Sequence, residues 1–145
     1  MVRFREGNKI LDFNIAGYEF PNVISKEAKG DYDSNWLICQ FVYSDGRLNE
    51  TYTDACLLTF ELEELATSLR LIINGQAESY TSEYLEPYLS IEILKQADLI
   101  SWNIDFVYDT SDDWKSRQIK MELDTQEAQT ILSGILEMLS AFPER

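Results

Sequence analysis

The sequence contains no histidine, and it has only 12 basic side chains against 26 acidic ones. Histidine is the commonest acid–base catalyst at neutral pH and the commonest metal ligand, so its absence disfavours enzymes and metal sites of those kinds. The net charge of -14 disfavours binding to nucleic acid and to anionic membranes, because both repel an acidic surface. The same charge would steer a basic partner toward the protein. The composition therefore indicates a binder of something positively charged.

Glycine and cysteine are scarce, and long apolar runs are absent. None of the six glycines is spaced as GxGxxG or GxxxxGK[ST], and the two cysteines form no CxxC pair that could hold zinc. No apolar stretch approaches the ~20 residues that cross a bilayer, and residues 1–6 are not followed by the apolar segment of a secretory signal. We expect a cytoplasmic protein with no cofactor, no metal site and no membrane contact. Its charge favours a monomer or small dimer.

The remaining composition is typical of one folded domain. A chain of 145 residues with 45% apolar content can bury a core without a metal or a disulfide. Residues 1–75 and 76–145 each have the pattern of antiparallel strands followed by one helix. We predict an α+β fold in which an antiparallel β-sheet built from hairpins has two amphipathic helices packed on one face. Two packed sheets with flanking helices is the alternative.

Three hairpins are predicted from alternating apolar residues on either side of a tight turn. The predicted turns and pairs are Gly7-Asn8 with Phe4 opposite Leu11 and Val2 opposite Phe13, Asp45-Gly46 with Tyr43 opposite Leu48, and Gln96-Ala97 with Ile93 opposite Ile100. In the second register Cys56 lies about opposite Asn35, four residues along from Cys39. That separation exceeds the ~7 Å between Cα atoms that a disulfide can span, so both thiols are expected to be free.

Two amphipathic helices are predicted from apolar residues at helical spacing. The first begins with Thr59 as its N-cap and ends at Asn74-Gly75. The second begins at a capping box formed by Asp124 and Glu127 and ends before Pro143. Tyrosines recur every four residues through the polar stretch that follows the first helix, which suggests one or two further helical turns at Tyr80, Tyr84 and Tyr88.

The candidate binding residues lie in two acidic segments that are expected to be loops. The first segment, within the polar stretch 25–35, has the oxygen spacing at which a calcium loop begins. Position 6 of such a loop is Trp36, where glycine is required, so an Asx-rich loop that enters a strand is the better interpretation. The second segment ends in a tryptophan, which is either part of a solvated turn or a contact anchor ringed by charge. The candidates for partner binding are Asp31, Tyr32, Asp33, Asp109, Asp112, Asp113 and Trp114.

Three stretches of the first half resemble the WapI-like immunity proteins of bacteria. They are GYEFP at 17–21, YDSNWL at 32–37 and CLLTFELEEL at 56–65. Proteins of this family are small and cytoplasmic, and they are encoded beside large wall-associated toxins of the contact-dependent or polymorphic class. They bind and silence the C-terminal domain of the toxin, often a nuclease acting on RNA. The resemblance implies a cognate toxin domain as the partner. It supplies no catalytic residues, and the shared motifs are expected to determine the fold rather than to contact the partner.

The charge and the resemblance lead to the same hypothesis, a stoichiometric inhibitor of a basic toxin domain. A nuclease active site is lined with Lys and Arg, which an acidic inhibitor could occupy. Acidic side chains would then set the association rate, and buried aromatic ones the lifetime of the complex. Two alternatives stay open. One is an acidic binding or scaffold module with an unknown partner, and the other is an enzyme that uses paired carboxylates or a divalent metal.

Overall fold

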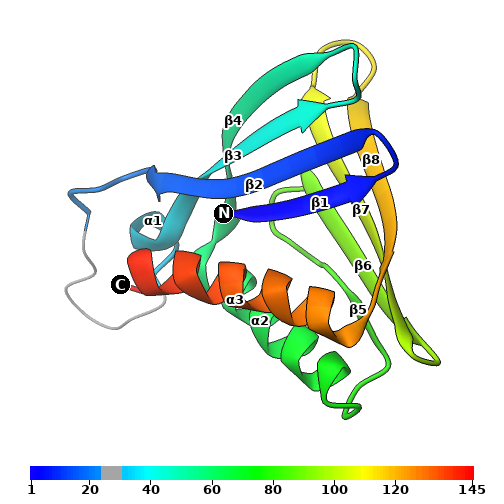
Figure 1. The fold of residues 1–145 in the computed structure, drawn as a ribbon. Coiled ribbons are helices and arrows are strands. Elements are labelled where there is room, and N and C mark those ends of the chain that lie inside the picture. Colours follow the sequence, from blue (N-terminus) through cyan, green and yellow to red (C-terminus); the bar gives the residue numbers. More distant parts are fainter. Residues whose placement is uncertain (24–30) are drawn as a thin grey trace.

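The computed structural model describes residues 1–23 and 31–145, and its strands form two four-stranded antiparallel sheets (Figure 1). The first sheet has the order β1 (Val2–Glu6), β2 (Lys9–Tyr18), β3 (Trp36–Ser44), β4 (Asn49–Leu58). The second has the order β5 (Ser79–Thr81), β6 (Leu89–Gln96), β7 (Leu99–Asp109), β8 (Lys115–Leu123). The helices are α1 (Tyr32–Asn35), α2 (Thr59–Ile73) and α3 (Thr125–Ala141). The α+β class is confirmed. The strands form two sheets, as in the alternative arrangement, instead of one.

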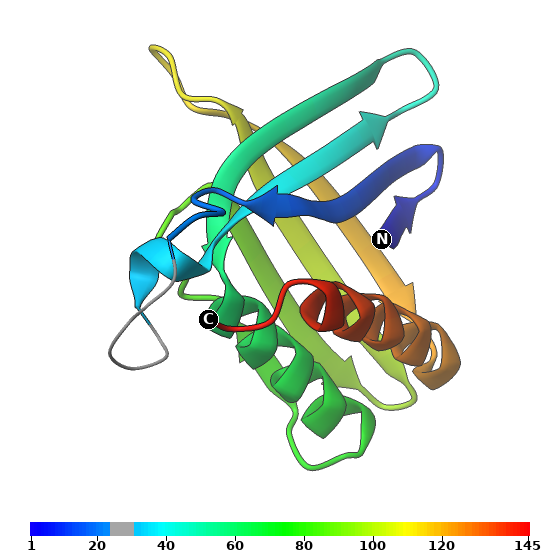
Figure 2. The same cartoon turned by 90° about the vertical axis from the view of Figure 1, so that its left-hand side faces the viewer.

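Each sheet is a simple meander that is followed in the chain by one long helix, and the two helices lie side by side (Figures 1 and 2). The inward side chains of both sheets and both long helices form one hydrophobic core. Between the sheets, the rings of Phe41 and Phe106 stack with centroids 5.0 Å apart. Gly134 allows α3 to approach the start of the chain, because a Cβ there would lie 2.9 Å from the backbone oxygen of Met1.

The register of the first hairpin is confirmed, with Phe4 opposite Leu11 and Val2 opposite Phe13. The second predicted register is wrong by two residues, because Tyr43 pairs with Glu50. The Asp45 side chain accepts hydrogen bonds from the backbone N–H groups of Arg47 (3.0 Å) and Leu48 (2.9 Å), which closes a four-residue loop instead of a two-residue turn.

The third predicted register is also wrong by two residues. Ile93 pairs with Trp102, and the turn consists of Ala97 and Asp98, with Ala97 at a φ of 53°. A shift of two residues leaves every side chain on its predicted face, because side chains alternate with a period of two. The apolar faces are therefore as predicted, although the pairs are not.

The corrected register also changes the relation between the cysteines. Cys39 pairs with Asp54, and Cys56 lies at a register shift between β3 and β4. Hydrogen bonding with the Cys39 thiol raises the pKa of Cys56, and burial raises it further. Both thiols are free and buried, and the expectation of free thiols is confirmed, but the predicted position of Cys56 opposite Asn35 is wrong.

The long helices begin and end close to the predicted residues. The capping box of α3 is confirmed, since the Glu127 N–H donates to Asp124 Oδ1 at 2.8 Å and the Asp124 N–H donates to Glu127 Oε2 at 2.9 Å. The N-cap predicted for α2 is wrong by one residue. Leu58 is the N-cap, and the Thr59 hydroxyl instead donates to Asn35 Oδ1 at 2.7 Å.

The helical turns predicted around the recurring tyrosines do not form. Tyr80 lies in β5 and pairs with Ile93, and Ser82 continues this pairing through hydrogen bonds to Ile91. Residues 82–88, which we call the connector, then run to β6 without a helix. Tyr80 is buried, and Tyr84 and Tyr88 pack against the core.

Candidate functional site

The first group of predicted contact residues lies on α1, which is a helical turn where a loop was expected; residues 25–30 of that expected loop lie outside the described residues. The Asp31 carboxylate caps the turn. Hydrogen bonds from the hydroxyl and the backbone N–H of Ser34 hold the pKa of Asp31 below its usual range. Tyr32 is 53% exposed, and its ring lies 5.6 Å from that of Phe60 at the start of α2. Asp33 is exposed.

The turn is anchored by the fully buried side chain of Asn35. Its amide donates to the backbone oxygens of Asp31 (2.7 Å) and Arg145 (3.0 Å), and its Oδ1 accepts from the Thr59 hydroxyl (2.7 Å) and the Arg145 N–H (2.9 Å). The Arg145 guanidinium donates to three backbone carbonyls, those of Phe20, Pro21 and Ser34. These contacts join the three stretches that resemble the immunity proteins, so they support the interpretation of those stretches as fold determinants.

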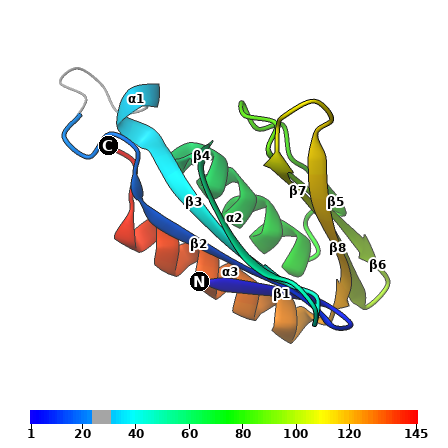
Figure 3. The same ribbon diagram turned by 90° about the horizontal axis from the view of Figure 1, so that it is seen from above.

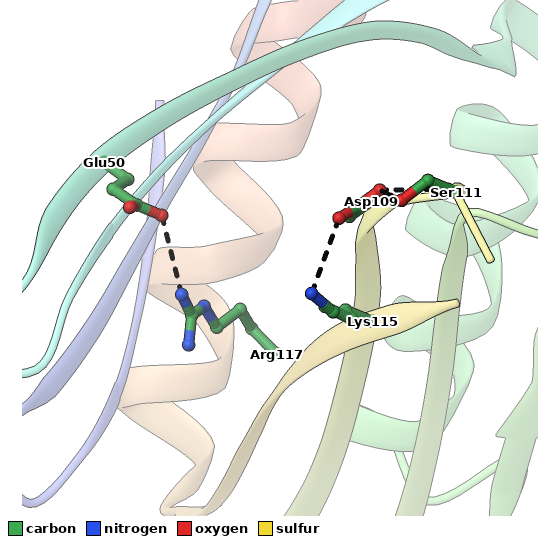
Figure 4. Close-up of polar contacts among 5 residues, drawn as sticks. All are labelled: Glu50, Asp109, Ser111, Lys115 and Arg117. Atoms are coloured by element: carbon green, nitrogen blue, oxygen red, sulfur yellow. Dashed lines mark hydrogen bonds and ion pairs between the residues drawn. The ribbon is translucent and has the colours of Figure 1, made fainter. Parts of the chain in front are cut away.

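The second group runs from Asp109, the last residue of β7, into the loop between β7 and β8 (Figure 4). Hydrogen bonds from the Ser111 hydroxyl (2.6 Å) and N–H (2.9 Å) hold the pKa of Asp109 below its usual range. Lys115 lies 3.8 Å from the same carboxylate. Trp114 is 55% exposed, and its ring lies 5.7 Å from that of Tyr88 in the connector. The remaining two acids of the loop, Asp112 and Asp113, are exposed.

The two groups do not meet, but they lie on the same side of the molecule. Figures 2 and 3 show α1, the start of α2, the connector and the β7–β8 loop following one another along that side. We call residues 31–35, 60–64, 82–88 and 109–114 together the acidic side. These four segments contain ten acidic side chains and no basic one, and all ten except the buried Glu61 lie at the surface. Such a surface attracts a positively charged partner and repels polyanions.

Some basic side chains lie elsewhere in the described part of the chain. A surface groove of about 820 Å³ lies between β1, β8 and α3, and its lining includes Arg3, Arg5 and Lys120 together with Glu6, Glu122 and Glu127. Arg3 donates two hydrogen bonds to Asp12, at 2.7 and 2.8 Å. Basic and acidic side chains are therefore mixed at this groove, whereas the four segments of the acidic side contain acidic residues and no basic one.

A family model described as the immunity protein WapI-like family matches residues 2–143. The chain belongs to the WapI-like immunity protein family. Membership supports an immunity function with a cognate toxin as partner, and it suggests an inhibitory role without catalysis.

No curated protein matches this WapI-like immunity protein. Two solved structures are similar to it at low identity. The plant transcriptional regulator PBF-2 is 12% identical, with a TM-score of 0.44 over 97% of this chain and 79% of that one. WHY3 from Arabidopsis thaliana is 11% identical, with a TM-score of 0.40 over 97% of this chain and 86% of that one. At these TM-scores neither structure informs the function of the WapI-like protein.

The described residues show neither a group of metal-ligating side chains nor a helix that could span a membrane. Within residues 1–23 and 31–145, no three His, Cys, Asp or Glu side chains are grouped so that they could hold a metal ion. In the same part of the WapI-like chain, no helix is both long and apolar enough to cross a membrane.

Three further residues of the WapI-like protein position the acidic side or link the two sheets, and none of them was predicted as a site residue. Glu61 is buried at the start of α2 and accepts the N–H of Leu85 in the connector at 2.7 Å. Arg145 joins α1 to residues 20–21 through the hydrogen bonds of its guanidinium. Arg117 lies over the ring of Tyr108 and pairs with Glu50 at 3.5 Å, which links the two sheets (Figure 4). Of the three, only Arg117 could have been noticed in the sequence. It is a charged residue at a position of β8 where the alternation of side chains predicts an inward-facing one.

Proposed function

We propose that this WapI-like immunity protein binds the C-terminal domain of its cognate toxin through the acidic side, and that the toxin domain is a basic nuclease. The observation that carries the proposal is the set of nine acidic side chains that are not buried, without a basic one, across four segments that adjoin in space. Nuclease active sites present Lys and Arg to phosphate, so an acidic surface complements them. Binding would be stoichiometric and would involve no catalysis, cofactor or metal.

The exposed rings within the acidic side suit the second requirement of an inhibitor, a long-lived complex. Tyr32 and Trp114 are each more than half exposed, and each packs on a further aromatic ring, Phe60 or Tyr88. Tyrosine and tryptophan dominate binding energy when a partner buries them. We assign partner contact to Asp31, Tyr32, Asp33, Asp109, Asp112, Asp113 and Trp114. The high charge suits a monomer or small dimer, and the free thiols suit the reducing cytoplasm.

The test measures binding to the purified C-terminal domain of the toxin encoded beside the gene. One triple variant replaces exposed acids of the acidic side, Asp33→Asn, Asp112→Asn and Asp113→Asn. It leaves Asp31 and Asp109 intact, because both cap their own turns. We expect association at low ionic strength to slow by about tenfold, and its salt dependence to weaken.

A second triple variant makes the same change in net charge on other surfaces, with Asp98→Asn, Glu122→Gln and Glu137→Gln. All three of these side chains are exposed. We expect it to associate nearly as fast as the unchanged protein. Equal slowing in the two triple variants would contradict the assignment of the acidic side. Lack of any binding by the unchanged protein would contradict the proposed function.

A further inference from the structure

The connector lies between the two predicted contact groups and exposes an apolar side chain of its own. Leu85 is 54% exposed, much like Tyr32 (53%) and Trp114 (55%). Glu83 and Glu86 flank it, and residues 82–88 contain no basic residue. An apolar residue surrounded by acidic ones is suited to a partner that is basic around an apolar depression. This segment was not predicted as a contact site from the sequence, because its tyrosines suggested a helix.

The backbone of Leu85 is held by a buried carboxylate. Glu61 is only 7% exposed, and its two oxygens accept the N–H groups of Leu58 (2.9 Å) and Leu85 (2.7 Å). Within residues 1–23 and 31–145, no ion pair involves Glu61. Burying a carboxylate is unfavourable unless hydrogen bonds replace its water, so both N–H groups are needed to keep it there.

Glu61 also lies between the supports of the two contact groups. Phe60, the preceding residue, carries the ring against which Tyr32 packs. On the other side of Leu85, Tyr88 packs on Trp114, and its carbonyl accepts the Val107 N–H at 2.8 Å. The connector is thus attached to α2 through Glu61 and to β7 through Tyr88. If Leu85 shifted away from Glu61, the position of Leu85 relative to the rings of Tyr32 and Trp114 would change.

We propose that Leu85 is a third toxin contact, between Tyr32 and Trp114, and that Glu61 is the residue that positions it. This inference rests on the proposed function, because the occupant of the surface is the same basic toxin domain. Leu85 would be buried in the complex. Glu61 would touch no toxin atom and would act through the backbone of Leu85.

The first experiment compares Leu85→Ser with Leu94→Ser, which changes a leucine of similar exposure (43%) on β6. Affinity for the purified toxin domain is measured by surface plasmon resonance, and stability by thermal melting. We expect Leu85→Ser to weaken binding by at least about fivefold, mainly through faster dissociation, with little change in melting temperature. Leu94→Ser should bind like the unchanged protein. Unchanged binding by Leu85→Ser would overturn the inference while leaving the proposed function in place.

The second experiment is a double-mutant cycle between Glu61→Gln and Leu85→Ser. A glutamine side chain offers one acceptor oxygen where the carboxylate offers two, so one N–H loses its partner. We expect Glu61→Gln to weaken binding when Leu85 is present and to have no further effect on binding in the Leu85→Ser background, while it lowers the melting temperature in both. An equal loss of affinity in the two backgrounds would overturn the positioning role. If Glu61→Gln does not fold, Leu85→Ser alone still tests the contact.

Discussion

Asn35 is a fully buried polar side chain whose partners come from distant parts of the chain. It bonds to Asp31 four residues away, to Thr59 at the start of α2 and to Arg145 beyond α3. Buried polar groups of this kind contribute modestly while they are all paired, and leaving them unpaired is expensive. The Asn35 amide is therefore a central contact of α1, beside the Asp31 cap and the hydrogen bonds from the Arg145 guanidinium.

We predict that Asn35→Ala lowers the free energy of unfolding by about 2–4 kcal/mol, because the Thr59 hydroxyl and the Arg145 N–H lose their buried acceptor. Urea denaturation measures the change. Asn49→Ala is the control, since Asn49 is exposed at the start of β4, and it should change stability by no more than about 0.5 kcal/mol. A loss below about 1 kcal/mol for Asn35→Ala would show that other contacts hold α1.

Single residues also show where prediction from the sequence fails for the candidate site. The acidic segments were predicted as contact sites because charged and aromatic residues cluster along the chain at 31–33 and 109–114. Glu61 was not found, because it is one of several acids in the first turns of a helix, and nothing in the sequence indicates which one is buried. Arg145 was not found because its partner Asn35 is separated from it by 110 residues.

At the scale of elements, the apolar faces of strands and helices were predictable and the turns were less so. The period of two fixes which side chains face the core, and this held for each of the three hairpins. The register depends on the turn, and only the Gly7-Asn8 turn was predicted correctly. At Asp45 a side-chain cap lengthened the loop, and in the third hairpin the positive φ belongs to an alanine. Neither feature has a strong local signal.

The turn between β6 and β7 can be stabilised by substitution, because Ala97 adopts a φ of 53°, which is unfavourable for a residue with a Cβ. We predict that Ala97→Gly stabilises the protein by about 1 kcal/mol in urea denaturation. Ala55→Gly, in β4, has no positive φ to relieve and should destabilise it by a similar amount. A loss of stability for Ala97→Gly would mean that the flexibility of glycine in the unfolded chain outweighs the relief of strain.

At the scale of the whole molecule, the pairing of Tyr80 and Tyr84 between β5 and the connector connects folding to alkaline pH. Their hydroxyls lie 3.2 Å apart, and burial raises the pKa of Tyr80 to about 12 and that of Tyr84 well above its ordinary value of 10.0. A raised folded-state pKa favours the neutral form. Its contribution to stability is therefore complete below pH 10 and is lost as the pH rises from 10 toward 12.

We predict that the free energy of unfolding falls over this alkaline range and that Tyr80→Phe makes the fall shallower, because one of the two groups no longer titrates. Urea denaturation below pH 10 and between pH 10 and 12 measures the slope, and tyrosinate absorbance follows the ionisation. The same slope in Tyr80→Phe and in the unchanged protein would show that Tyr80 does not couple ionisation to folding.

The hydrogen bonds between Arg145 and Asn35 of α1 have a consequence for synthesis on the ribosome. Tyr32 and its neighbouring acids are translated early, but the residue that completes the hydrogen bonds behind them follows 110 positions after Asn35. At about 5–20 residues per second, that interval is roughly 5–20 s. During it the nascent chain lacks one end of the proposed binding surface. If the acidic side is the toxin-binding surface proposed above, a chain would inhibit the toxin only after Arg145 has been added, so protection would depend on immunity protein made before the toxin arrives.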